Sequence, residues 1–197
     1  SEGQILINGI PLEQISFSEL HKRIAFLEQD TYLFDMTIGE NIGIAKPGAS
    51  IEEIKDAAKQ AGIAEFIDTL PEGYDTDMGQ MSARLSGGER QRINIGRSLL
   101  CPFDMLLMDE PTSELDPKME ETAMDFIFET AKERTVIYTA HKLKTLLYAD
   151  KILYLKKGKI EDFGKTEEVI RRNRYFEKYT ESAAFQDSEQ FVEGGAR

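Results

Sequence analysis

Cysteine is nearly absent from this sequence, and its scarcity narrows the class of protein. The single cysteine, Cys101, excludes a disulfide within the chain and favours a reducing compartment. Its apolar neighbours Leu99, Leu100 and Phe103 indicate a small buried residue rather than a reactive thiol.

Long hydrophobic runs and excess positive charge are missing as well. No apolar run approaches the roughly 18 residues that span a bilayer, and no basic-then-apolar leader opens the chain. We therefore expect a soluble segment in the cytosol. The chain has 24 Lys and Arg against 36 Asp and Glu, a net charge of −12. This balance argues against binding to nucleic acid or to anionic lipid, so no nucleic-acid partner is expected.

The sequence also lacks a lysine-bearing phosphate loop, which requires glycine, four residues and then Gly-Lys-Ser or Gly-Lys-Thr. The one Gly-Lys-Thr run is Gly164-Lys165-Thr166, and Gly158 lies one residue too far upstream. The intervening sequence is charged and strand-like rather than rich in glycine. We therefore predict that this segment is not a phosphate loop.

The remaining pattern alternates strands with helices. Hydrophobic residues make up 41% of the chain, enough for a substantial core. Alternation of this kind favours a parallel α/β sheet covered on both faces. From about Arg174 we expect a short helix and a loose tail. Strands are predicted at 4–9, 24–27, 105–110 and 135–140. Helices are predicted within 37–70 and at 87–100, 116–134 and 142–149, and a hairpin at 151–164 that turns at Lys157-Gly158.

Two adjacent carboxylates, Asp109 and Glu110, follow the apolar run "MLLM". In open α/β folds ligands bind at the carboxyl ends of the strands. Asp109 is placed to lie near a magnesium ion, and Glu110 to orient or deprotonate a water. A strand that simply ends in solvated acids before Pro111 is an equal alternative on this motif alone.

The segment "LSGGE" combines a helix cap with two glycines. Ser86 and Glu89 form a capping box, which by itself explains both residues. Gly87 and Gly88 occupy the first helical positions, where each costs about 1 kcal/mol of helix stability. Bare amides at a helix N-terminus form an anion site that glycine leaves open to close approach. The pattern therefore favours contact with a phosphate.

Two further polar residues follow apparent strand ends. His141 comes just after the strand expected at 135–140, a position where a histidine is more often a cap or a surface residue. Its place beyond the same sheet edge as Asp109 and Glu110 favours a functional role. Gln29, after the strand at 24–27, is uninformative alone.

The sequence resembles the nucleotide-binding domain of ATP-binding cassette (ABC) transporters. The resemblance rests on five segments in order along the chain: the Gln29 loop, "LSGGERQR", "MLLMDE", "SELD" and "TAHKL". The resemblance runs from about residue 3 to residue 170. The linking segments "EGQILINGIPLEQIS", "QDTYLFDMTIGENI" and "EFIDTLPEGYDT" are similar to the exporter branch.

The resemblance implies a P-loop NTPase-like parallel sheet with an inserted α-helical subdomain. Residues 1–30 would be core up to the Gln29 loop, and 31–90 the helical subdomain ending in the signature "LSGGERQR". Residues 91–172 would be catalytic core and 173–197 a C-terminal helix or tail.

The resemblance also implies roles for the residues of the strand ends. Gln29 and Asp109 would help hold Mg²⁺, and Glu110 would act as general base on the attacking water. His141 would sense the γ-phosphate of ATP.

At the signature, Ser86, Gly87 and Gly88 would clamp the γ-phosphate of ATP bound to the opposite subunit, and Asp116 would communicate across the dimer. The partners implied are a second nucleotide-binding domain, as homodimer or heterodimer, and a transmembrane domain. The expected location is the cytoplasmic face of the cell membrane.

Some positions depart from the family pattern. The Walker A loop is absent from these 197 residues, so we expect little ATPase activity from them alone. Gln80 and Ser82 stand where exporters often carry Glu and Gly, and Gly96 replaces a usual alanine. One alternative is a naturally truncated, non-catalytic cassette that pairs with a complete ATPase. A non-transport ABC ATPase of DNA maintenance is disfavoured by the acidic charge.

Overall fold

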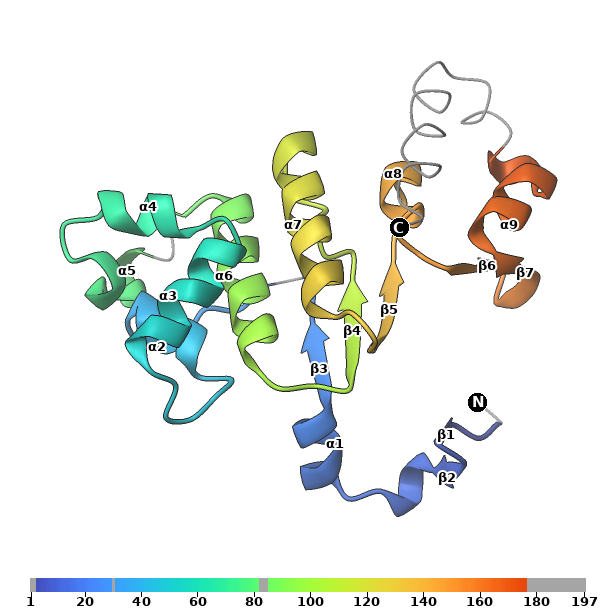
Figure 1. Ribbon diagram of the computed structural model, residues 1–197, viewed down its shortest axis with the longest axis horizontal. Coiled ribbons are helices and arrows are strands. Elements are labelled where there is room, and N and C mark those ends of the chain that lie inside the picture. Colours follow the sequence, from blue (N-terminus) through green and yellow to red (C-terminus); the bar gives the residue numbers. More distant parts are fainter. Residues whose placement is uncertain (1–2, 30, 82–84, 177–197) are drawn as a thin grey trace. The chain divides into compact units, whose positions relative to one another are not determined.

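The structure, a computed structural model, describes residues 3–29, 31–81 and 85–176. The chain divides into two compact units, Ser1–Thr139 and Ala140–Arg197. Figure 1 shows a parallel sheet with helices in the first unit and a hairpin with helices in the second. The tail expected beyond Arg174 lies almost wholly outside the described residues, as does Ser82.

The first expected strand, ending near Gly9, is shorter than predicted and forms one arm of a short hairpin. β1 (Leu6–Ile7) and β2 (Ile10–Pro11) pair antiparallel. Asn8 and Gly9 both have positive φ, 51° and 80°, which is the backbone that a tight two-residue turn requires. The 3-10 helix η1 (Leu12–Gln14) and helix α1 (Phe17–Arg23) follow.

The sheet of the first unit has the order β3-β4-β5, and every described pair is parallel. β4 (Met105–Asp109) lies between β3 (Ile24–Leu27) and β5 (Thr135–Thr139). The α/β fold with a parallel sheet is therefore confirmed, and β4 is its central strand.

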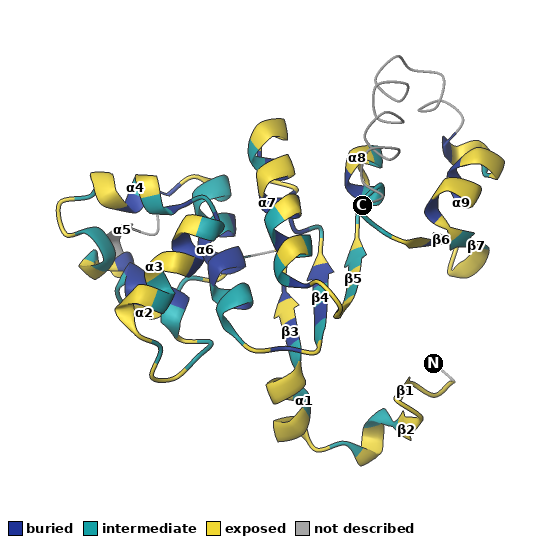
Figure 2. Cartoon of the chain, viewed as in Figure 1, coloured by how far each residue is buried: buried dark blue, intermediate teal, exposed yellow. Residues whose placement is uncertain are grey.

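The two faces of this sheet differ in burial. Leu27, Leu106 and Met108 are buried, whereas Phe26 and Ile137 on the opposite face are 54% and 55% exposed. Figure 2 shows exposed segments on β3 and β5, whereas β4 is mostly buried or intermediate. The expectation of a sheet covered on both faces is wrong for this unit, because Phe26 and Ile137 are more than half exposed on the second face. An apolar strand sequence predicts burial but does not indicate which face of the strand another element covers.

A group of short helices lies between β3 and the signature. Ser50 caps its helix in a reciprocal box with Glu53, and Gly62, with a φ of 69°, follows the end of that helix, as expected. The elements are α2 (Ile38–Gly43), α3 (Ile51–Gln60), α4 (Ala64–Thr69), η2 (Gly73–Asp75) and α5 (Met78–Met81).

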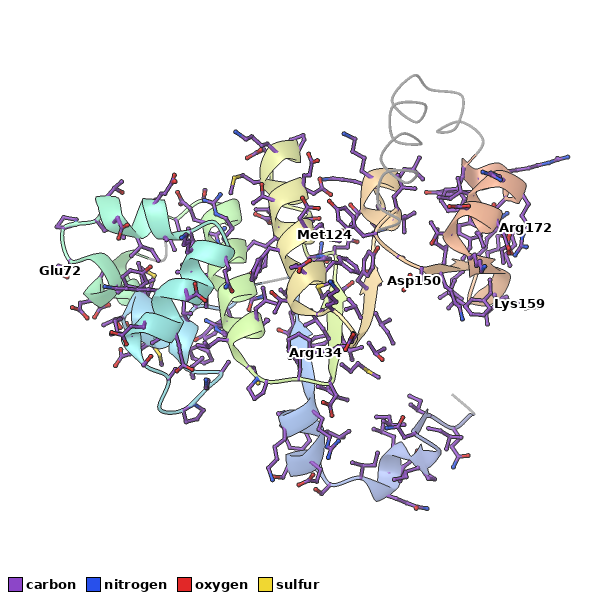
Figure 3. The ribbon with its side chains drawn as sticks, in the orientation of Figure 1. Glu72, Met124, Arg134, Asp150, Lys159 and Arg172 are labelled. Carbon is purple, nitrogen blue, oxygen red and sulfur yellow. The ribbon has the colours of Figure 1, made fainter. Side chains whose placement is uncertain are left out.

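Two longer helices flank the central strand. α6 (Gly87–Leu100) contacts α2, α3 and β3, and its bounds are those expected from the sequence. α7 (Pro117–Thr130) begins with Pro117 after the cap Asp116. Figure 3 labels Met124, a fully buried residue of α7.

The second unit contains α8 (Leu143–Leu146), β6 (Lys151–Lys156), β7 (Lys159–Lys165) and α9 (Thr166–Arg172). The strands form the expected hairpin, turning at Lys157 and Gly158, which have φ of 51° and 74°. Its core consists of Ile152, Val169, Ile170 and Phe176.

Arg172 of α9 holds the hairpin from one side. Its guanidinium donates to both carboxylate oxygens of Asp162, and Nη2 also donates to the Phe163 carbonyl oxygen. The hydrogen bonds from Arg172 hold the pKa of Asp162 below its ordinary value.

Candidate functional site

The carboxyl end of the sheet brings Asp109 and Thr139 together. These residues are paired across β4 and β5, and the Thr139 hydroxyl donates to Asp109 Oδ1 at 2.6 Å. Asp109 is exposed. An exposed carboxylate fixed by a neighbour at a strand end is a suitable cation ligand.

Glu110 follows directly and has an unusual backbone. Its φ is 44°, in the left-handed region that a non-glycine residue rarely adopts. Its N–H donates to Thr139 Oγ1 at 3.0 Å, and its carbonyl oxygen accepts from the N–H of Ser113 at 3.2 Å. A conformation of this kind costs about 1–3 kcal/mol and persists only when its surroundings enforce it.

Gln29 is exposed just beyond β3. Because β3 and β4 are parallel, with Leu27 paired to Met108, both strands end at the same sheet edge. Asp109 is the last residue of β4, and Gln29 follows β3 by two residues. Its role as a magnesium ligand stays a prediction.

The signature helix has the predicted capping box. Ser86 Oγ accepts from the Glu89 N–H at 3.3 Å, and Glu89 Oε2 accepts from the Ser86 N–H at 2.8 Å. Ser86 itself is exposed. The cap satisfies these donors and leaves Gly87 and Gly88 at the first two helical positions.

The glycines of the signature are in close contact with the loop before α7. A Cβ built on Gly87 would lie 1.4 Å from Glu114 Oε2, and one on Gly88 would lie 3.2 Å from the Glu114 carbonyl oxygen. A carboxylate therefore already lies against the first turn of α6. The helix N-terminus accommodates an anionic oxygen where a side chain would fill the space.

Sequence reasoning missed the polar residues that α6 buries. Gln91 is 1% exposed and Asn94 is 7% exposed. Asn94 Nδ2 donates to the Glu28 carbonyl oxygen at 3.4 Å, beside Gln29. The available signal was their helical spacing on the same side of the helix.

Gln91 connects the signature helix to two loops. Its Nε2 donates to the Glu110 carbonyl oxygen at 3.4 Å, and its Oε1 accepts from the Glu114 N–H at 3.2 Å. A single buried amide thus links α6 to the residue after β4 and to the loop that touches Gly87.

Arg97, farther along α6, holds the loop after Gln29. It donates to the carbonyl oxygens of Asn41 and Tyr32, at 2.8 Å and 3.0 Å, and to the Asn41 side-chain oxygen at 3.0 Å. Its guanidinium also lies over the Phe34 ring, 5.3 Å from the centroid. Burial lowers the pKa of this guanidinium.

The surroundings of Asp116 and His141 do not test the roles expected for them, which stay predictions. Asp116 Oδ1 accepts from the N–H groups of Lys118 and Met119, both at 3.1 Å, which makes it the cap of α7. His141 is exposed and belongs to the second unit.

The Gly164-Lys165-Thr166 run lies in β7 and at the first residue of α9. Thr166 donates its hydroxyl to the Ala149 carbonyl oxygen. The run is therefore part of a strand and a strand-to-helix junction, which confirms that it is not a phosphate loop.

No helix within the described ranges is long and apolar enough to cross a bilayer. Nor do the described side chains include a cluster of three or more His, Cys, Asp or Glu residues that could hold a metal ion.

Comparison with known proteins decides the family. The model of a family described as ABC transporter matches residues 1–113, more than half of the chain. The chain belongs to the ABC transporter family. Its resemblance to the exporter-type nucleotide-binding domain is thereby confirmed, together with the fold that it implied.

Individual ABC proteins agree with this assignment. The heterocyst differentiation ATP-binding protein of Nostoc sp. is 38% identical over 91% of this chain and 30% of its own length. The ATM1-type heavy metal exporter of Novosphingobium aromaticivorans is 40% identical over 93% of this chain and 30% of its own. A solved bacterial Atm1-family ABC exporter with ATP bound superposes with a TM-score of 0.85 at 39% identity, over 90% of this chain and 31% of that one. The chain thus spans about 30% of the length of these relatives.

Proposed function

We propose that this chain provides much of the ATP-binding and ATP-hydrolysing domain of an ABC exporter. The domain would couple ATP hydrolysis to transport at the cytoplasmic face of a membrane, with a transmembrane domain as partner. The export function named for its relatives supports this proposal, as does an ATP-bound exporter of the same fold.

The signature helix would bind a nucleotide phosphate. Ser86 is exposed, and Gly87 and Gly88 present backbone without side chains at a helix N-terminus. The Glu114 carboxylate against Gly87 supports the fit, because its oxygen shows that an anionic oxygen can lie where a Cβ would be. The phosphate would belong to ATP held by a second nucleotide-binding domain, in a homodimer or a heterodimer.

The sheet edge would support Mg²⁺ and the reaction. Bound MgATP would supply the β–γ phosphate bond and an ion that offsets its charge. Asp109, oriented by Thr139, would hold the magnesium with Gln29. One or two protein ligands are usual for Mg²⁺ when phosphates and waters complete its coordination shell.

Glu110 would orient the attacking water and accept its proton. Asp116 would communicate between subunits, and His141 would contact the γ-phosphate. The observation that carries the proposal is the fixed pair Asp109-Glu110 at the end of the central strand, tied to the signature helix through Gln91.

Glu110→Gln in the full-length gene product tests this function. We expect ATP turnover to fall by about a hundredfold or more while MgATP binding persists, because the amide cannot take the proton. Glu121→Gln, at an exposed residue of α7, is the matched control. Undiminished turnover in Glu110→Gln would contradict the proposal.

A further inference from the structure

The backbone of Glu110 is held from two sides by side chains of other elements. Thr139 of β5 accepts from its N–H, and Gln91 of α6 donates to its carbonyl oxygen. The strained φ of 44° lies between these two contacts. Strain that surrounding groups enforce at a reacting residue points to a role in positioning.

We propose that Gln91 and Thr139 are the positioning residues of the general base. They fix Glu110 in its left-handed conformation and so direct its carboxylate toward the water. The inference rests on the proposed function, in which Glu110 takes the proton of that water.

Thr139 performs two tasks with one hydroxyl group. It donates to Asp109 Oδ1 and accepts from the Glu110 N–H. The magnesium ligand and the base are therefore set relative to each other by one side chain. A hydroxyl can do both, whereas the isosteric side chain of valine can do neither.

Gln91 adds a link to the signature. Its amide is buried, so its two hydrogen bonds have little competition from water. One bond reaches Glu110 and the other reaches Glu114, whose carboxylate lies against Gly87. The position of the base thus depends on the same residue that fixes the loop over the phosphate-facing glycine.

The test measures steady-state ATP hydrolysis by the full-length gene product. Gln91→Met removes both hydrogen bonds, and Gln91→Glu removes the donor to Glu110 but keeps the acceptor for the Glu114 N–H. Thr139→Val removes both contacts of the hydroxyl, and Thr139→Ser restores them. Matched controls are Gln60→Met on α3 and Thr135→Val at the opposite end of β5.

We expect kcat to fall about tenfold to a hundredfold in Gln91→Met, Gln91→Glu and Thr139→Val, because misplacing a reacting group by about 1 Å has this effect. KM for ATP should change less than kcat does, because both residues contact Glu110 and neither lies at the phosphate-facing turn, although Thr139 also contacts the magnesium ligand Asp109. Thr139→Ser should recover most of the loss. In a Glu110→Gln background, Gln91→Glu should have no further effect, because it keeps the acceptor for the Glu114 N–H and loses only the donor to Glu110.

Three results would overturn the inference. The first is a kcat within about twofold of wild type in both Gln91→Met and Thr139→Val. The second is a loss of nucleotide binding in step with kcat, which indicates a purely structural role. The third is a further loss from Gln91→Glu in the Glu110→Gln background. If Gln91→Met fails to fold, the comparison of kcat between Thr139→Val and Thr139→Ser decides whether the inference holds.

Failure of this inference is distinct from failure of the proposed function. If Glu110→Gln abolishes turnover but the positioning variants do not reduce it, only the inference falls. If Glu110→Gln retains turnover, Glu110 is not the general base, and the proposed function itself is contradicted.

Discussion

Replacing Gly96 by alanine should stabilise the signature helix. Gly96 is buried in the interior of α6, where glycine costs about 1 kcal/mol relative to alanine. A Cβ there would meet the Ala57 carbonyl oxygen at 3.4 Å and the Ala61 Cβ at 3.5 Å, which are ordinary contact distances. Burying one more methyl group adds at most about 0.8 kcal/mol. The expected gain is therefore about 1–2 kcal/mol.

Amide hydrogen exchange in the full-length gene product measures this gain. Slow-exchanging amides of α6 should be protected roughly fivefold to thirtyfold more in Gly96→Ala. Gly96→Leu is the control, because the same neighbours leave no room for a larger side chain and overpacking costs about 1–3 kcal/mol. Reduced protection in Gly96→Ala would refute the assigned packing of α6 on α3.

Two further substitutions test individual contacts. Arg97→Met should destabilise the first unit by about 2–3 kcal/mol, because it leaves backbone acceptors without their charged donor. The control Arg23→Met breaks an exposed ion pair and should cost less than about 1 kcal/mol. Chemical denaturation measures the free energy of unfolding of both variants. Arg172→Met should lower the free energy of unfolding of the second unit above about pH 4, where Asp162 of the unfolded chain is ionised. This difference from wild type should vanish as the pH falls through the pKa of Asp162 in the folded protein, which lies below its ordinary value. A variant as stable as wild type at neutral pH would contradict the second expectation.

Local sequence rules were sufficient for the signature helix. The capping box needs only Ser86 and Glu89 at the correct spacing, and α6 begins and ends where the sequence predicted. The hairpin at Lys157-Gly158 was predictable for the same reason, because a tight turn depends on its own residues.

The contacts that fix Glu110 were beyond such rules. Gln91 lies 19 residues from Glu110 in sequence, and Thr139 lies 30 residues from Asp109. Only the parallel pairing of β4 with β5 and the packing of α6 bring these groups together. Burial had the same limitation, because the exposure of Ile137 depends on what covers its face of the sheet.

A mixed dimer tests the central claim most directly, that Ser86, Gly87 and Gly88 serve ATP bound to a partner domain. Ser86→Asp retains a good helix cap but places a negative charge beside the phosphate, so it should preserve the fold and abolish turnover. Dimers of Ser86→Asp alone and of Glu110→Gln alone should both be inactive. Co-expression with two affinity tags would isolate the dimer that contains one copy of each variant.

In that mixed dimer, one site would combine an intact Glu110 with an intact signature from the other chain. The account predicts ATP turnover well above that of either parent dimer. A mixed dimer as inactive as its parents would contradict it, because each site would then depend on the base and the signature of a single chain.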